Sequence, residues 1–227
     1  MFLAHFGVGF GVKRLAPATS LGSLFLAAQL IDLVWPTLLM LGIERVTILV
    51  GSSQHPPLDF TYYPYSHSLL AVLVWAALIA FAYRMLHAYP RGALVLGAAV
   101  FSHWLLDLLV HRPDLPLYPG SATMAGFGLW ASLPATIALE LLIFGAGVWL
   151  YCRSTEAIDR VGHWALWGLV ALLLLISAGD MAGGEPPPSV TALAWVGQAQ
   201  WLLVAWAYWV DRHRRSRSRA AELVPAV

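Results

Sequence analysis

Long apolar runs separated by short polar stretches dominate this chain. Each run approaches the ~20 residues that a helix needs to cross a bilayer, and the runs are rich in Leu and Ala without strand-like alternation. We therefore predict an all-α fold, a polytopic membrane helical bundle with about six transmembrane helices. The spans that we expect are residues 19–43, 67–87, 91–111, 130–151, 162–179 and 190–210.

The composition supports a membrane protein. Hydrophobic residues make up 59% of the 227 residues and charged residues 11%, whereas soluble domains carry about 25% charged residues. We divide one bundle into a core, residues 1–151, two additional transmembrane helices, residues 152–210, and a basic cytoplasmic tail, residues 211–227. The single cysteine, Cys152, excludes an internal disulfide and a thiolate metal cluster.

The basic residues predict how the bundle is oriented. Lys and Arg are enriched on the cytoplasmic side of membrane proteins, and here they alternate along the spans, at Lys13, Arg14, Arg84, Arg91, Arg153, Arg160, Arg212, Arg214, Arg215, Arg217 and Arg219. We expect a multi-pass protein of the cell inner membrane with both termini near the cytoplasmic side. Topology and attraction to membrane lipids explain the basic tail, and a formal net charge of +1 gives no reason to expect a nucleic-acid partner.

The segment MFLAHFGVGFG precedes Lys13 and Arg14. It has no basic leader and no clear cleavage site, so we expect it to be retained. As a short membrane-inserted helix it would reach roughly 18 Å into the bilayer and bring His5 near its middle; as an interfacial helix it would lie flat on the surface. Its glycines could allow another helix to approach closely.

Ionisable residues interrupt the apolar runs. In SHWLLDLLVHRPD, His103, Asp107 and His111 recur every four residues, which places them on one helical face. Other spans contribute Asp32, His67 and Glu140. Because ionisable groups are costly in a bilayer, such residues usually mark a functional site.

Two interpretations fit this set of residues. Imidazole nitrogens and carboxylate oxygens are ligands for divalent metals such as zinc, and His103 and Asp107 could hold one ion from a single helix. With three protein ligands and one open position, a bound water could ionise near neutral pH and attack an ester. Alternatively, His103, Asp107 and Glu140 could form a polar network that only fixes helix packing. Taken together, the set favours a metal site.

The order of these residues resembles a known family. His5 in a short apolar segment, Asp32 within a helix, His67 followed by Ser68, and His103 with Asp107 resemble the LexA-binding, inner-membrane-associated metal-dependent hydrolases. That family is distantly similar to zinc-dependent phospholipase C. The resemblance covers roughly residues 1–151. It implies a divalent metal, zinc above all, held by His5, Asp32, His67, His103 and Asp107.

The chain departs from the family pattern around Asp32. Ile31 stands where the family commonly has proline, and Val34 and Trp35 occupy the place of an acidic residue or histidine. This departure affects the number of metals that the site would hold.

We expect the protein to be a hydrolase acting on a lipid or lipid-like ester in the outer half of the membrane. Asp32 would be a metal ligand or general base, and Glu140 would return a proton to the leaving oxygen. His111 and Arg112 would either bind substrate at the mouth of the site or cap a helix that Pro113 ends. The alternatives are an ion- or proton-translocating protein that uses the same residues and a structural membrane subunit of a larger complex.

Overall fold

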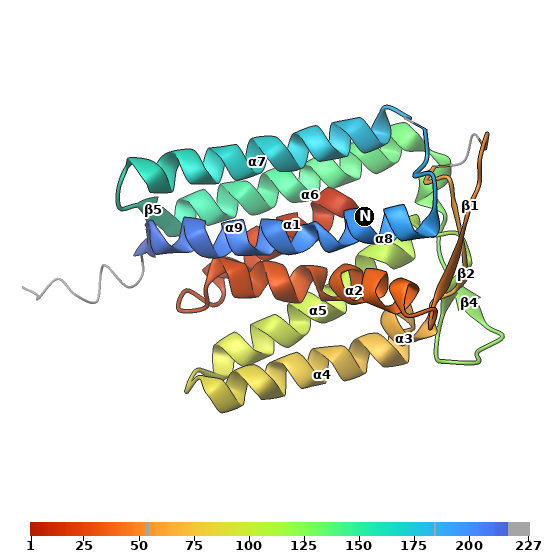
Figure 1. The fold of residues 1–227 in the computed structure, drawn as a ribbon. Coiled ribbons are helices and arrows are strands. Elements are labelled where there is room, and N and C mark those ends of the chain that lie inside the picture. Colours follow the sequence, from red (N-terminus) through yellow and green to blue (C-terminus); the bar gives the residue numbers. More distant parts are fainter. Residues whose placement is uncertain (53–54, 184, 218–227) are drawn as a thin grey trace, which may run out of the picture.

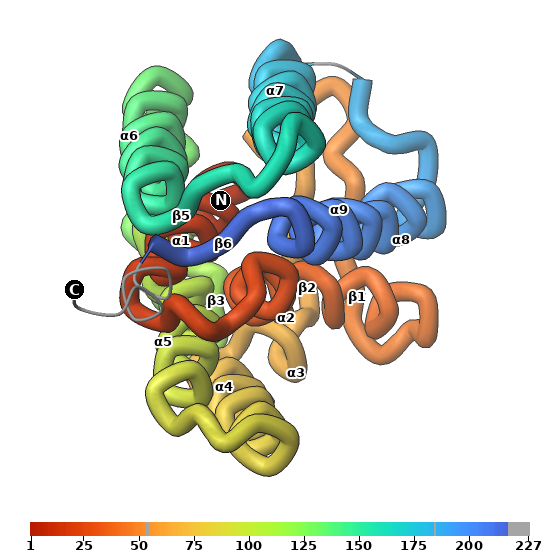
Figure 2. The backbone as a smooth tube through the Cα atoms, turned by 90° about the vertical axis from the view of Figure 1, so that its left-hand side faces the viewer, coloured from red at the N-terminus to blue at the C-terminus, as the bar shows by residue number. Residues whose placement is uncertain are grey.

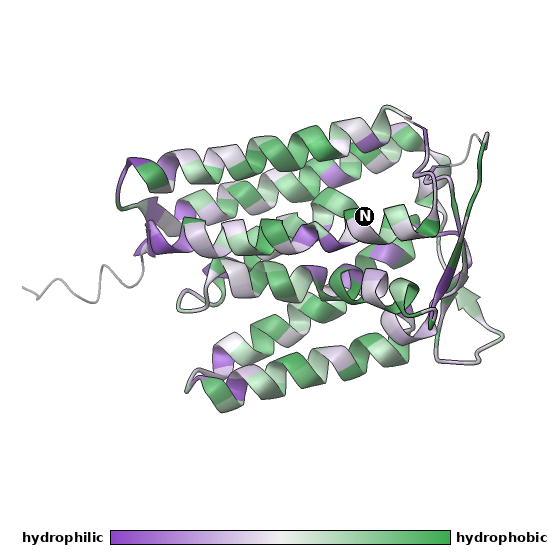
Figure 3. Cartoon of the chain, in the orientation of Figure 1, coloured by the Kyte–Doolittle hydropathy of each residue, from purple (hydrophilic) through white to green (hydrophobic). Residues whose placement is uncertain are grey.

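The computed structural model describes residues 1–52, 55–183 and 185–217. Six helical stretches are long and apolar enough to cross a membrane, which confirms the predicted helical membrane bundle (Figure 1). They are α2 (Leu21–Met40), α4 (Leu69–Leu86), α5 (Pro90–Val110), α6 (Leu133–Ser154), α7 (Arg160–Met181) and a last stretch divided into α8 (Val190–Gln198) and α9 (Gln200–Arg212). Figure 3 shows that these helices are mainly hydrophobic, while hydrophilic residues gather in the connections at both ends of the bundle.

Local capping fixes where several helices begin. The hydroxyl of Ser20 accepts a hydrogen bond from the Ser23 amide at the start of α2, and the hydroxyl of Ser68 does the same for Ala71 at the start of α4. The carboxylate of Asp159 caps α7 in the same way. These side chains satisfy backbone amides that have no partner within the helix.

The short N-terminal helix α1 (Phe2–Gly11) lies inside the bundle, packed against α2, α5 and α6. Most of its residues are buried, so the inserted helix is confirmed and the flat interfacial helix is wrong. Glycines permit the close contact with α6. A Cβ atom on Gly7 would lie 2.7 Å from the Cα of Phe144, and one on Gly147 would overlap the carbonyl group of Gly7.

One end of the bundle, which we call the hairpin end, carries short strands and the helix α3 (Pro64–His67). Strands β1 (Arg45–Ile48) and β2 (Leu58–Tyr62) form an antiparallel hairpin. Strands β3 (Leu115–Pro116) and β4 (Met124–Ala125) pair nearby, followed by the 3-10 turn η2 (Leu129–Ala131). These elements lie beyond the helix ends on the right of Figure 1.

The opposite end, which we call the arginine end, faces the viewer in Figure 2. It carries the 3-10 turn η1 (Val12–Arg14), the connection between α4 and α5, and strand β5 (Thr155–Ala157) paired with β6 (Arg214–Ser216). The first part of the expected basic tail therefore folds back against the connection between α6 and α7. Arg219 of that tail lies outside the described residues.

Candidate metal centre

The five residues predicted as metal ligands come together between α1, α2, α3 and α5. They form two overlapping groups whose ligand atoms lie within 4.8 Å of one another, and His103 belongs to both. The first group is His5, His103 and Asp107, and the second is Asp32, His67 and His103. We call the five residues the His/Asp cluster.

His103 lies at the centre of the His/Asp cluster. Its Nε2 atom is 3.1 Å from Asp107 Oδ2 and 3.6 Å from Asp32 Oδ1. Asp32 Oδ1 is in turn 3.5 Å from His67 Nε2, and His5 Nε2 is 3.2 Å from Asp107 Oδ1. The rings of His5 and His103 are stacked, with their centroids 3.7 Å apart. His67 therefore groups with Asp32 and His103, and Asp107 groups with His5 and His103.

Four of the five residues of the cluster are buried, and Asp32 is the exception. His5, His67, His103 and Asp107 are buried. The Asp32 side chain is 24% exposed. A molecule that reaches the cluster would therefore meet the Asp32 carboxylate first.

A backbone carbonyl orients the central imidazole. His103 Nδ1 lies 2.9 Å from the carbonyl oxygen of Ala28, so Nδ1 donates its hydrogen there and Nε2 faces the two carboxylates. Nε2 is buried and makes no hydrogen bond to the described residues, although Asp107 Oδ2 lies 3.1 Å away. A ring nitrogen and two carboxylates that face one another require a proton or a cation between them, and they are ligand types that divalent metals accept, so these residues fit a metal.

A buried carboxylate that the sequence analysis missed orients His67. His67 Nδ1 lies 2.7 Å from the Ser66 hydroxyl, which donates to Glu44 Oε2 at 2.6 Å. Glu44 Oε1 also accepts from the backbone amides of Tyr65 and Ser66, at 2.8 and 2.9 Å. This chain of contacts leaves His67 Nε2 for Asp32 or a metal, as is common behind metal-binding histidines. In the sequence Glu44 is only an acid that follows an apolar run.

Glu140 is buried near the cluster but belongs to neither group. Its Oε2 atom accepts a hydrogen bond of 2.6 Å from the backbone amide of Leu3. The carboxylate therefore holds the first turn of α1, where backbone amides lack helical partners. Its expected role in proton transfer stays a prediction.

His111 and Arg112 follow the end of α5 and contact the loops of the hairpin end. His111 Nδ1 lies 2.9 Å from Asp114 Oδ1, to which the Tyr63 hydroxyl also donates. Burial lowers the pKa of His111 and raises the pKa of Tyr63. Arg112 donates to the Leu58 carbonyl at 2.9 Å. These contacts attach the end of α5 to the hairpin, and the expected substrate contacts stay a prediction.

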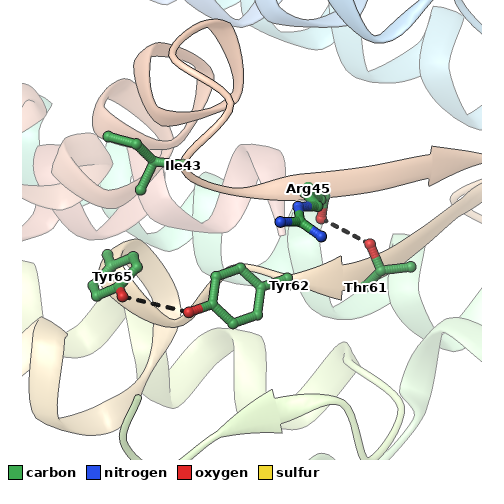
Figure 4. Close-up of a pocket in the computed structure, with 5 residues that line it drawn as sticks. All are labelled: Ile43, Arg45, Thr61, Tyr62 and Tyr65. Atoms are coloured by element: carbon green, nitrogen blue, oxygen red, sulfur yellow. Dashed lines mark hydrogen bonds between the residues drawn. The ribbon is translucent and has the colours of Figure 1, made fainter. Parts of the chain in front are cut away.

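A cavity of about 490 Å³ opens at the hairpin end (Figure 4). The Thr61 hydroxyl donates to the Arg45 carbonyl, and the Tyr62 hydroxyl donates to that of Tyr65. Arg45 and Tyr65 are the sequence neighbours of Glu44 and Ser66, so the cavity adjoins the segment that orients His67. Its lining residues are Ile43, Arg45, Thr61, Tyr62 and Tyr65.

No protein-family model, curated protein or solved structure matches this chain. The fold and the site therefore define its class: an α-helical membrane protein with buried His and Asp groups that could bind a metal ion.

Proposed function

We propose that this protein is a zinc-dependent membrane hydrolase that acts on a lipid or lipid-like ester. The observation that carries the proposal is the His/Asp cluster, in which three imidazoles and two carboxylates converge around the unsatisfied Nε2 of His103. The residue pattern that resembles inner-membrane metal-dependent hydrolases agrees with it.

We assign metal-binding and orienting roles to the residues in and around the cluster. His5, His103, Asp107 and His67 would hold the ion, and Asp32, which lies beside His67 and His103, would take part in the reaction. A bound zinc ion supplies Lewis acidity toward the ester and lowers the pKa of water. Glu44, acting through Ser66, would orient the His67 ring so that Nε2 is available to the ion.

The chain itself supplies the proton transfers. Asp32 is the accessible carboxylate and accepts a proton from the attacking water, as a general base within hydrogen-bond reach would. Glu140 Oε2 is held by the Leu3 amide, so Oε1, protonated before the reaction, is the oxygen that we assign to protonation of the leaving group. Asp32 then releases its proton to solvent and Glu140 takes one up, which restores both groups. Closure of the site around four buried ligands strengthens these electrostatic interactions.

Two features support a lipid-like substrate: the depth of His103 within the bundle and the cavity at the hairpin end. His103 lies seven residues inside the last residue of α5, about 10 Å along the helix, so an ester buried in the membrane can reach it more readily than a soluble substrate. Arg45, Tyr62 and Tyr65 line the adjoining cavity, where they offer a guanidinium and two hydroxyls to a polar headgroup. His111 and Arg112 are further candidates for such contacts.

The orientation is part of the proposal. The arginine end lies in the cytoplasm if the distribution of Lys and Arg follows the usual rule, and the hairpin end then faces outward across the inner membrane. In a Cys152→Ser background, an impermeant thiol reagent should label Ala122→Cys from outside and Ala157→Cys only after lysis. Labelling of both positions from one side would contradict this topology.

The test of function is metal analysis combined with hydrolysis. The purified protein should contain zinc and should hydrolyse a lipid ester or phosphodiester slowly, and a chelator should stop the reaction until zinc is restored. Asp32→Asn keeps shape and hydrogen bonding but loses the charge, so it should lower hydrolysis by at least about a hundredfold. His163→Ala, an exposed histidine on α7, is the control.

Two results would overturn the proposal. One is equal, substoichiometric zinc in the wild type and in His103→Ala, which would leave a packing network. The other is intact lipid esters together with ion or proton flux in proteoliposomes that a chelator does not stop, which would favour translocation. Buried acids and imidazoles in a bundle are also typical of proton relays.

A further inference from the structure

A second cavity, of about 370 Å³, lies at the arginine end. The close approach of α1 and α6 at Gly7 and Gly147 brings the turn η1, which follows α1, beside the last turn of α6 (Figure 2). The residues that line the cavity are Arg14, Trp149, Arg153 and Ser154.

The two arginines of this cavity have no carboxylate partner among the described residues. The acids at this end are occupied by other cations. Glu156 pairs with Arg215 at 2.7 Å, Asp159 with His213 at 2.8 Å, and Asp211 with Lys13 at 3.0 Å. Arg153 instead lies over the ring of Trp149, 5.2 Å from its centroid. Two guanidinium groups that share one cavity repel each other, and an anion between them would relieve that repulsion.

An exposed apolar stripe on α6 leads from the cavity along the helix. Leu142, Ala146 and Trp149 precede Arg153 at spacings of four, three and four residues, which places them on one helical face, and all are exposed. Gly145 borders the stripe, and a Cβ atom there would meet nothing within 4 Å. Between the larger side chains of Leu142 and Trp149, the stripe is therefore lower at Gly145 and Ala146, and this leaves the backbone open to a hydrocarbon chain.

We propose that this cavity binds the phosphate of an anionic phospholipid, with one acyl chain lying along the stripe on α6. The guanidinium groups of Arg14 and Arg153 match phosphate oxygens in a bidentate manner, and basic pockets at the membrane surface are typical sites for such headgroups. Free phosphate shares this chemistry, but the apolar stripe favours the lipid. The site lies at the opposite end of the bundle from the His/Asp cluster and does not depend on its function.

The test uses the full-length protein, delipidated in neutral detergent, with bound lipid counted by native mass spectrometry. Phosphatidylglycerol, phosphatidylcholine and inorganic phosphate are titrated separately. We expect one retained phosphatidylglycerol, with phosphatidylcholine binding at least tenfold more weakly and millimolar phosphate failing to displace the lipid. Each arginine near the surface contributes about fivefold in affinity, so the double variant R14Q/R153Q should bind phosphatidylglycerol about 25-fold more weakly.

The matched control is R84Q/R91Q. It removes the same charge from exposed positions at the same end, outside the cavity, and should leave phosphatidylglycerol binding within about twofold of the wild type. An equal loss in both double variants would mean general surface attraction and would overturn the site. Equal affinity for the two lipids would overturn it as well.

A third variant separates the two sources of phosphate. Gly145→Leu fills the low section of the stripe without touching either arginine, so it should weaken phosphatidylglycerol binding by at least about fivefold. Unchanged binding in this variant, or displacement of the lipid by millimolar phosphate, would identify a free-anion site and overturn the assignment to a lipid.

Discussion

The two ends of the bundle use the same kinds of side chain in opposite ways. At the arginine end, each carboxylate lies against a cation: Asp211 against Lys13, and Asp159 against His213. Toward the hairpin end, the ring nitrogens and carboxylates of the His/Asp cluster share partners, and His103 Nε2 faces two acids without a hydrogen bond. Matched pairs stabilise a fold by themselves. In the cluster the Met1 amino group donates to Asp107 Oδ1 at 3.0 Å, and the ring nitrogens that face Asp32 and Asp107 require a proton or a further cation.

The buried position of Lys13 sharpens this contrast. Its ammonium group donates to the Thr19 carbonyl at 2.7 Å and to Asp211 at 3.0 Å, so a residue expected only to mark the cytoplasmic face also joins η1 to α9. Glu156, which is half-buried, and Asp159, which is exposed, are held by cations from the segment that follows α9. Arg215 lowers the pKa of Glu156, and His213 lowers the pKa of Asp159. The structural and the candidate functional charges are thus separated along the bundle.

The largest effect should come from His103→Ala. Because His103 belongs to both groups that could hold a metal ion, its loss should reduce zinc affinity by more than about a hundredfold, beyond the 10- to 100-fold that loss of an outer-shell partner costs. Elemental analysis of purified protein measures this, with His163→Ala as the control. Unchanged zinc content would mean that the His/Asp cluster does not bind zinc, so that both ends of the bundle carry only structural charges.

The reverse experiment breaks the pairing at the arginine end. Lys13→Met leaves the partly buried Asp211 carboxylate without its cation, so the free energy of unfolding should fall by roughly 3 kcal/mol. Lys13→Met combined with Asp211→Leu should recover most of this loss. Denaturation in detergent measures both variants, and zinc content should be unchanged. Loss of zinc in Lys13→Met would show that the two ends are coupled.

A smaller effect is expected from Ser66→Ala, which breaks the contact between Glu44 and His67. The proposed zinc ligands remain, but His67 loses the partner that orients it, so zinc affinity should fall by about 10- to 100-fold. Competition with a chelator of known affinity measures the change. Ser121→Ala, in the loop between β3 and β4, is the control, and a fall in thermal stability without a change in zinc affinity would contradict the positioning role.

The smallest effect concerns pH. His213 and the Gly162 amide hold the pKa of Asp159 below its usual value, so the unfolded chain takes up this proton at a higher pH than the folded one. The stability that Asp159 contributes to the folded state is fully present above about pH 4, the pKa of the unfolded chain. It is lost as the pH falls through the lower pKa of the folded state. Thermal unfolding with a chelator present should show this loss in the wild type and less of it in His213→Gln. Identical pH profiles would exclude the pair as a source of acid sensitivity.

Much of the fold could be predicted from the sequence because its physical causes are local. The length and hydrophobicity of each run determine a membrane span, and serines such as Ser20 and Ser68 determine where helices begin. The spacing of His103 and Asp107 placed both on one face of α5 before any fold was known. The spans begin and end within a few residues of the positions that we expected.

Only the tertiary structure decided which of these residues meet. The sequence left open whether α1 enters the bundle, and the close contact with α6 through Gly7 and Gly147 decided it. It did not reveal Glu44 behind His67, the pair of Lys13 with Asp211, or the two arginines at one cavity, because each joins residues from different elements. Helix formation depends on neighbours along the chain, but pairing of polar groups depends on which helix faces come together, and in this protein side-chain size at the helix contacts sets those faces.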